Sequence, residues 1–207
     1  LVNARIANED DDVMLVTDSG RAIRFSTTAV RVFKGRKSTG VRGIKLLGDD
    51  KVVSMSIIRH FEASPDERSA YLKMRRAVAG MSDDEVSSQE EEEEEINVNA
   101  TISPEKYAEM SAAENLILTI TSSGSGKLSS SHDYPVRGRG GMGVSAIDKK
   151  MRGGLLVASF PVEIEDQIML ATSNGQSIRV PVEGISFRSR SAGGVKVFNT
   201  GEDEQVV

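Results

Sequence analysis

Three short basic turns contain the residues of this sequence that could do chemistry. They are residues 35–41 (Gly-Arg-Lys-Ser-Thr-Gly-Val), 138–144 (Gly-Arg-Gly-Gly-Met-Gly-Val) and 189–195 (Ser-Arg-Ser-Ala-Gly-Gly-Val). Each has an arginine in second place and ends in Gly-Val. A glycine turn lets backbone N–H groups approach a phosphate closely, and the arginine adds charge and a bidentate fork. The turns therefore indicate contact with a polyanion. The alternative is that the glycines only allow tight turns and the arginines only solvate them.

Other kinds of chemistry find little support in the sequence. The two histidines, His60 and His132, lie in different segments and have no metal-ligand spacing. The run 124–127 (Gly-Ser-Gly-Lys) resembles a phosphate-binding loop, but Thr121 and Leu128 stand where that motif needs glycine and Ser/Thr. We find no catalytic constellation and expect no cofactor or metal in this chain.

Composition limits where the protein works. There are no cysteines, which fits a reducing compartment, and there is no apolar run long enough to span a membrane. We therefore expect a cytoplasmic protein without a membrane partner.

The three turns belong to a repeat. Strand-like runs at 13–17, 116–121 and 168–172 are each followed by a glycine hairpin turn and then by one of the basic turns. About four short strands in roughly 50 residues is typical of a propeller blade. We predict an all-β protein of β-propeller or β-pinwheel blades, the alternative being a two-sheet sandwich.

The repeat gives a domain organisation. Residues 1–58 read as the end of one blade, with a strand near Leu1–Ile6, plus a full blade with strands at 30–32 and 41–46. Residues 115–207 read as two further blades. Three blades rarely close a ring. We therefore expect a fragment of a longer protein, with an unpaired strand edge at one or both ends.

Residues 59–114 read as an insertion between the first two units. They hold 6 basic and 15 acidic residues, a net −9, whereas the rest of the chain is +4. Ser64-Pro65-Asp66-Glu67 predicts a helix start with a capping box, running to Ala79, and Ser103 starts a shorter helix towards Ala113. We expect disorder over 82–99, which contains six consecutive glutamates. This run could mimic DNA, or it could be a solvated loop.

Several runs in order and at matching spacing closely resemble the C-terminal domain of the bacterial DNA gyrase A subunit. They are 12–15 (Asp-Val-Met-Leu), 40–44 (Gly-Val-Arg-Gly-Ile), 48–54 (Gly-Asp-Asp-Lys-Val-Val-Ser), 138–144 and 166–170 (Asp-Gln-Ile-Met-Leu). The resemblance implies a six-bladed β-pinwheel that wraps DNA around a basic edge, of which this chain would be the last three blades.

The resemblance also implies a role. The domain would bind double-stranded DNA and act with the rest of gyrase A and with gyrase B. ATP and Mg would belong to that parent type II topoisomerase. Tyr71, Tyr107 and Tyr134 match no cleavage motif, so no catalytic residue is expected here. The family's Gln-Arg-Arg-Gly-Gly-Lys-Gly box is absent, and 138–144 is a degenerate relative with Met142 in place of lysine.

Ten basic residues are our candidates for DNA contact, and they lie in or near the turns. They are Arg36, Lys37, Arg139, Arg190, Arg21, Arg24, Lys127, Arg137, Arg179 and Lys196. The hypothesis requires Arg36, Arg139 and Arg190 to lie along one margin.

Two other functions stay open. One is the related C-terminal domain of the topoisomerase IV A-type subunit. The other is a protein-interaction propeller whose insertion helices bind a partner through Tyr71 and Leu72.

Overall fold

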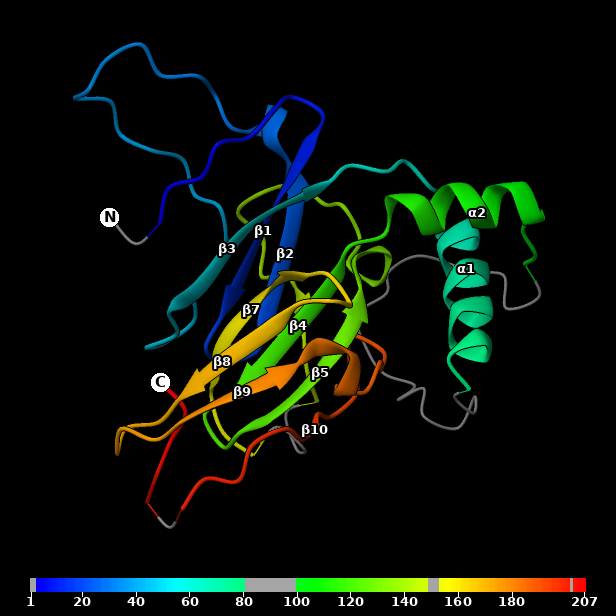
Figure 1. The fold of residues 1–207 in the computed structure, drawn as a ribbon. Coiled ribbons are helices and arrows are strands. Elements are labelled where there is room, and N and C mark those ends of the chain that lie inside the picture. Colours follow the sequence, from blue (N-terminus) through cyan, green and yellow to red (C-terminus); the bar gives the residue numbers. More distant parts are fainter. Residues whose placement is uncertain (1–2, 81–99, 149–152, 202) are drawn as a thin grey trace.

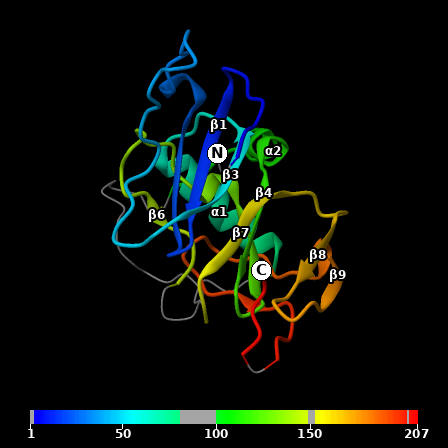
Figure 2. The same ribbon diagram turned by 90° about the vertical axis from the view of Figure 1, so that its left-hand side faces the viewer.

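The computed structural model describes residues 3–80, 100–148, 153–201 and 203–207, and these residues confirm the all-β prediction. Three antiparallel sheets follow one another through the molecule, and two helices pack at one side (Figures 1 and 2). The strands are β1 (Asp11–Thr17), β2 (Arg21–Ser26), β3 (Val52–Arg59), β4 (Leu116–Thr121), β5 (Ser125–Ser130), β6 (Val144–Ser145), β7 (Leu156–Val162), β8 (Gln167–Ala171), β9 (Ser177–Pro181) and β10 (Val195–Lys196). The helices are α1 (Pro65–Val78) and α2 (Pro104–Ala113).

Each complete sheet takes its fourth strand from the next repeat unit. The first sheet has the order β3-β1-β2-β6 and the second has the order β10-β5-β4-β7. Val144 of β6 lies opposite Ala22, and Val195 of β10 lies opposite Gly126. The Gly-Val end of a basic turn is therefore the point where the chain joins the sheet of the preceding unit. The sequence predicted the turns and strands but not this exchange.

Close backbone packing explains the glycine before each of these valines. A Cβ on Gly143 would lie 2.2 Å from the Ala22 carbonyl oxygen, and one on Gly194 would lie 3.0 Å from the Gly126 nitrogen. Gly143 also has a φ of +70°, which side-chain-bearing residues rarely adopt. The glycine lets the crossing chain approach the receiving strand.

The first and last units are incomplete. Residues 30–51 form no strand, and neither do residues 3–6, so the strands predicted at 1–6, 30–32 and 41–46 are wrong for the described residues. The physical reason is that strand pairing here needs a preceding unit, and none lies among the described residues. At the other end, and among the described residues, β9 pairs only with β8, which fits the predicted unpaired edge.

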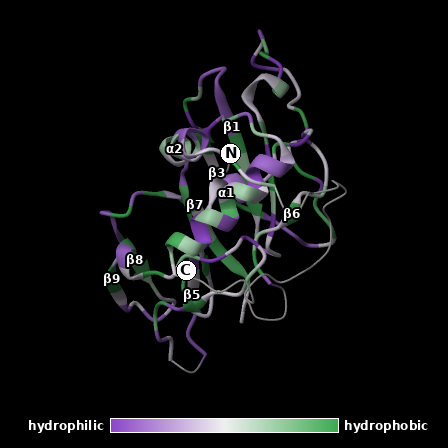
Figure 3. Ribbon diagram, turned by 90° about the vertical axis from the view of Figure 1, so that its right-hand side faces the viewer, coloured by the Kyte–Doolittle hydropathy of each residue, from purple (hydrophilic) through white to green (hydrophobic). Residues whose placement is uncertain are grey.

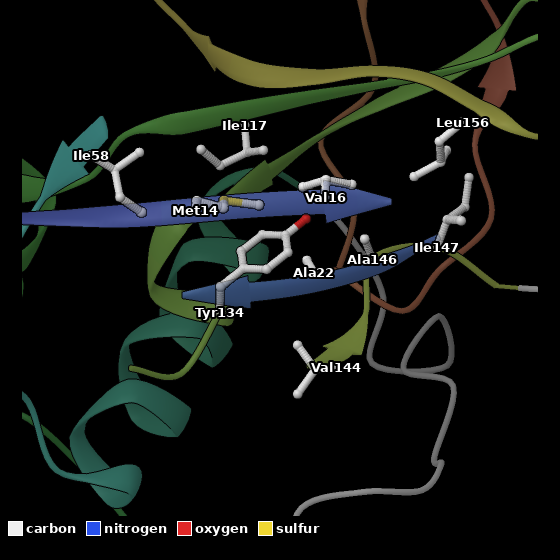
Figure 4. Packing of buried hydrophobic residues seen from close by; sticks show 10 residues of the cluster. All are labelled: Met14, Val16, Ala22, Ile58, Ile117, Tyr134, Val144, Ala146, Ile147 and Leu156. Atoms are coloured by element: carbon white, nitrogen blue, oxygen red, sulfur yellow. The ribbon is translucent and has the colours of Figure 1, made fainter. Parts of the chain in front are cut away.

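The main core fills the space between the first two sheets. It joins Met14 and Val16 of β1 to Ile117 of β4, with Tyr134 and Ile147 from the second unit (Figure 4). A second cluster, which includes Leu118, Leu128, Ile168 and Leu170, joins the second and third units. The units are therefore held together by shared cores as well as by strand exchange.

The insertion forms the two predicted helices. At the start of α1, the Glu67 N–H donates to the Ser64 hydroxyl at 3.2 Å, and the Ser64 N–H donates to the Glu67 carboxylate at 2.8 Å, which confirms the capping box. α1 has hydrophilic and hydrophobic stretches (Figure 3). The predicted disordered run 82–99 lies outside the described residues.

The helix pair packs on the second unit through aromatic side chains. Tyr71 is fully buried, with its ring 5.0 Å from that of His132, whose Nε2 is 2.8 Å from the Met110 carbonyl oxygen. This corrects the expectation that Tyr71 could bind a partner protein, because its side chain is already inside the fold.

Candidate nucleic-acid interface

The second basic turn, 138–144, presents its arginine to solvent. Arg139 is exposed, and it follows directly from the segment that makes a parallel bridge between Val136 and Arg24 of β2. Its Nε donates to the Ala29 carbonyl at 2.9 Å and its Nη1 donates to the Arg42 carbonyl at 3.2 Å. These bonds orient the guanidinium while leaving it accessible.

Backbone bonds attach this turn to the first unit. The Gly140 N–H donates to the Gly43 carbonyl at 2.6 Å, and the Lys45 N–H donates to the Gly141 carbonyl at 2.8 Å. Arg42 and Lys45 are both exposed. Three cations from two repeat units, Arg42, Lys45 and Arg139, therefore gather around one turn.

The two segments that meet at this turn contain basic residues and no acidic ones. Residues 28–48 have no Asp or Glu, and neither do residues 134–147. Together they carry eight basic residues: Arg31, Lys34, Arg36, Lys37, Arg42, Lys45, Arg137 and Arg139. We call this set the basic surface. Arg31, Lys34, Arg42 and Lys45 were not among the sequence candidates, although the long stretch without carboxylates could have identified them.

An open cleft of about 450 Å³ lies beside the second turn. It is lined by Arg21, Ile23, Arg137, Gly138, Gly141, Met142 and Gly143. The Arg21 guanidinium donates to the carbonyls of Met142 at 3.2 Å and Gly143 at 3.1 Å. Arg21 therefore fixes the turn from one side, and the cleft stays open to solvent.

The third turn, 189–195, is different because its carbonyls surround a buried lysine. Lys127 has no exposed surface, and its ammonium donates to the carbonyls of Ser189 at 2.8 Å, Ala192 at 2.7 Å and Arg190. Burial lowers the pKa of Lys127 to about 7. The lysine fills the turn from inside.

Arg190 also points inward. The residue is only 8% exposed, its Nε donates to the Asp133 carbonyl at 2.9 Å and its Nη1 donates to the Ser145 carbonyl. The backbone N–H of Arg190 donates to the Asp133 carboxylate at 2.6 Å. Arg190 thus bonds the third turn to the second unit.

Three of the ten candidate contacts are therefore wrong as surface residues. Arg190 and Lys127 bond to carbonyls inside the fold. Arg24 is 3% exposed and forms an ion pair with Asp12 at 2.7 Å, with further bonds to the Ser131 and Arg59 carbonyls. A buried cation in such a network holds structure together and cannot reach a phosphate. The requirement that Arg36, Arg139 and Arg190 share one outer margin fails at Arg190.

The remaining candidates divide between two ends of the molecule. Arg36 and Lys37 are exposed in the first turn, and the segment that carries them projects from the body (Figure 1). Arg179 is exposed on β9, and Lys196 is exposed and donates to the Ser123 carbonyl at 3.1 Å. The structure brings Arg21 and Arg137 together in the lining of the cleft, and Arg139 lies in the turn beside it.

The described residues contain neither a metal-ion cluster nor a helix that could span a membrane. No cluster of His, Asp or Glu in the described ranges is arranged to hold a metal ion. Within the same ranges, neither helix is long and apolar enough to cross a membrane.

The sequence matches the family model described as "DNA gyrase C-terminal domain, beta-propeller" over residues 11–59, 115–163 and 166–207. These three segments follow the three repeat units and leave out 60–114. Among curated relatives, the DNA gyrase A subunit of Granulibacter bethesdensis is 43% identical over the whole chain, which spans 23% of that protein. The Rickettsia bellii subunit is 38% identical over the whole chain, which spans 22% of it, and the Salmonella typhimurium subunit is 32% identical, with 17% of its length spanned.

Solved structures agree on the fold. The C-terminal domain of DNA topoisomerase IV superposes with a TM-score of 0.65 at 19% identity, covering 98% of this chain and 46% of that one. The Escherichia coli ParC C-terminal domain superposes with a TM-score of 0.55 at 12% identity, covering 97% of this chain and 62% of that one.

Proposed function

Because the chain belongs to the family of DNA gyrase C-terminal β-propeller domains, we propose that it is a non-catalytic module that binds and bends duplex DNA along the basic surface. The chain spans about a quarter or less of the length of the gyrase A subunits that it matches. Supercoiling, ATP hydrolysis with Mg, and action with the rest of gyrase A and with gyrase B are therefore part of the proposal for the longer protein.

The observation that carries the proposal is the joining of two all-positive segments at the second turn. Duplex DNA is a dense polyanion, and a protein that neutralises its phosphates gains affinity by releasing counterions. The basic surface offers arginines and lysines without an intervening carboxylate in either segment. Hydrogen bonds from Arg139 to Ala29 and Arg42 hold the segments at fixed positions. Cations spread along such a segment favour contact with the phosphate backbone of bent DNA. Contacts of this kind depend little on base sequence.

The proposal predicts the form of the salt dependence. Affinity for a labelled duplex should fall steeply as salt rises and should hardly change with base sequence. The triple change Arg42→Ala, Lys45→Ala and Arg139→Ala should reduce the slope of log affinity against log salt by about 3, since each phosphate contact contributes roughly 0.9. Weak salt dependence of the unmodified chain would contradict the proposal.

A matched pair of lysine substitutions tests whether DNA binds at the basic surface. Lys45 and Lys73 are both exposed lysines, but Lys73 lies on α1, away from the basic surface (Figure 1). Lys45→Ala should weaken duplex binding and reduce the salt slope by about 1, whereas Lys73→Ala should change neither. Equal effects from the two changes would mean that binding follows net charge and not this surface.

The alternatives named from the sequence have less support. The family model and the curated relatives name gyrase, and the likeness to topoisomerase IV concerns the fold alone. The protein-interaction alternative relied on Tyr71 and Leu72, of which Tyr71 is buried and Leu72 is half-buried.

A further inference from the structure

The second basic turn carries one large apolar side chain among glycines. Met142 stands between Gly141 and Gly143, and it is 43% exposed. We propose that Met142 is a wedge that enters between two neighbouring base pairs of bound duplex DNA and kinks the duplex at that step. The wedge depends on the proposed function, because it acts only on a duplex that the basic surface already holds.

The corresponding position differs in the other two turns. It is the fifth residue of each turn, and it is Thr39 in the first turn and Gly193 in the third. Neither residue offers a long apolar side chain. In the third turn the arginine, Arg190, is also buried. Met142 therefore combines a long apolar side chain with a turn that faces solvent.

Hydrogen bonds hold the backbone on both sides of Met142. The Arg21 guanidinium donates to the Met142 carbonyl at 3.2 Å and to the Gly143 carbonyl at 3.1 Å. The Lys45 N–H donates to the Gly141 carbonyl at 2.8 Å. Three consecutive carbonyls are thus fixed by the first unit. A side chain that separates base pairs needs such an ordered base, because ordering a mobile loop on binding would cost free energy.

The glycines leave the methionine without bulky neighbours in the turn. A Cβ added to Gly138 would meet no described atom within 4 Å, and one added to Gly141 would meet the Ile23 side chain at 3.9 Å. Larger residues at these two places would hold a duplex away from the turn. With glycines there, the duplex can come close enough for Met142 to reach its bases.

Cations surround the methionine. Arg21 and Arg137 line the cleft together with Met142, and Arg139 is exposed three residues before it. Proteins that kink DNA combine cations near the phosphates with an apolar wedge, such as Met, that partly unstacks one base step. The bent duplex then contacts more of the protein, which offsets the cost of unstacking. The second turn contains both parts of this arrangement.

A wedge of this kind favours some base steps without reading base edges. Pyrimidine–purine steps such as TA and CA are the easiest to unstack, so the kink should form there. Overall affinity stays nearly independent of sequence, because phosphate contacts supply most of it. Met142 would therefore decide where and how sharply the duplex bends, and the basic surface would decide how tightly it binds.

A duplex with one central TA step in an otherwise stiff sequence tests the wedge. 2-Aminopurine replaces the adenine of that step and fluoresces more strongly when its stacking is lost, while dyes on the two ends report bending by energy transfer. The unmodified chain should raise both signals. Met142→Ala should abolish the rise in 2-aminopurine fluorescence and reduce the bend by about 20° or more, the smallest kink that such wedges make. The salt slope of its duplex affinity should not change, since no charge is lost.

Three control variants separate the wedge from a general loss of contact. Met142→Leu keeps a long apolar side chain and should retain both signals. Met142→Lys should abolish the 2-aminopurine rise and steepen the salt slope by about 0.9, because it replaces an apolar side chain with one that can contact a phosphate. Met74→Ala removes a methionine that is 39% exposed on α1, away from the basic surface, and should behave like the unmodified chain (Figure 1).

The possible results distinguish the wedge from the proposed function. If the unmodified chain binds the duplex with a steep salt slope but does not raise 2-aminopurine fluorescence, the wedge is wrong and DNA binding stands. The same holds if Met142→Ala raises that fluorescence as much as the unmodified chain does. If the unmodified chain binds no duplex, the proposed function fails and the wedge fails with it.

Discussion

The second and third basic turns have related sequences and opposite surroundings. Turn 138–144 keeps Arg139 in solvent and borders an open cleft. In turn 189–195, Arg190 is buried against Asp133 and the interior is filled by Lys127. Similar turns therefore do two different jobs, one as a candidate phosphate site and one as an internal joint.

One position on the receiving strand accounts for much of this difference. The residue three places after the hairpin glycine is Ile23 in the first unit and Lys127 in the second. An isoleucine cannot donate to carbonyls, so the second turn is held from its rim by Arg21. A lysine can bond three carbonyls from beneath, so the third turn closes over it. The composition of a turn thus predicts its role less well than the strand that receives it.

Loss of the buried amine should have the largest effect. Lys127→Met leaves three turn carbonyls without their donor, and we expect the free energy of unfolding to fall by about 3 kcal/mol. The matched control Lys196→Met removes an exposed lysine and should change stability by less than about 0.5 kcal/mol. Denaturant midpoints measure both effects. Equal midpoints for the two variants would contradict the claim that Lys127 stabilises the third turn.

The next test compares alanine substitutions of the two turn arginines, Arg190 and Arg139. Arg190→Ala removes bonds to Asp133 and Ser145 and should reduce the free energy of unfolding by about 2 kcal/mol. Arg139→Ala should leave thermal stability within about 0.5 kcal/mol of the unmodified chain, because its side chain is exposed. A larger loss of stability from Arg139→Ala than from Arg190→Ala would reverse the comparison.

The lysine at the joint also predicts a pH dependence. Burial lowers the folded-state pKa of Lys127 to about 7, from an ordinary 10.5. Between these values the unfolded chain binds a proton that the folded chain lacks, so this group makes folding more favourable as pH rises. The stability difference between the unmodified chain and Lys127→Met should therefore grow from pH 7 towards pH 10. Unfolding curves of both proteins measure it, and a difference that shrinks over this range would contradict the direction.

The smallest expected effect is on binding at the exposed turn. Arg139→Ala should reduce the salt slope of duplex affinity by about 1, as the loss of one phosphate contact does. Arg179→Ala, at the far end of the chain on β9, tests whether contacts extend beyond the basic surface. We expect its effect to be smaller than that of Arg139→Ala, and the reverse order would move the interface to the third unit.

Local features were well predicted from the sequence. The hairpin glycines Gly20, Gly124 and Gly175 all have φ near +80°, and the Ser64 capping box forms as expected. These features depend on neighbours in sequence. The strands expected at 30–32 and 41–46 did not form. Alternation of polar and apolar residues suits a segment to a sheet, but it does not show which unit supplies the partner strand.

The site residues were harder to predict for the same reason. Arg24 and Arg179 occupy corresponding places in their hairpins, yet Arg24 is buried beside Asp12 and Arg179 is exposed. Basic character and spacing are equal in the two cases. The difference arises from the neighbouring unit. That unit covers β2, whereas among the described residues no further strand pairs with β9.

Protection of lysines by DNA tests the central claim most directly. A brief acetylation of the unmodified chain, with and without duplex and read by mass spectrometry, compares Lys45 of the basic surface with Lys73 of α1, both exposed. The account predicts that duplex slows modification of Lys45 and leaves Lys73 unchanged, while the buried Lys127 reacts slowly in both samples. Equal modification of Lys45 with and without bound duplex would contradict the assignment of DNA binding to this surface.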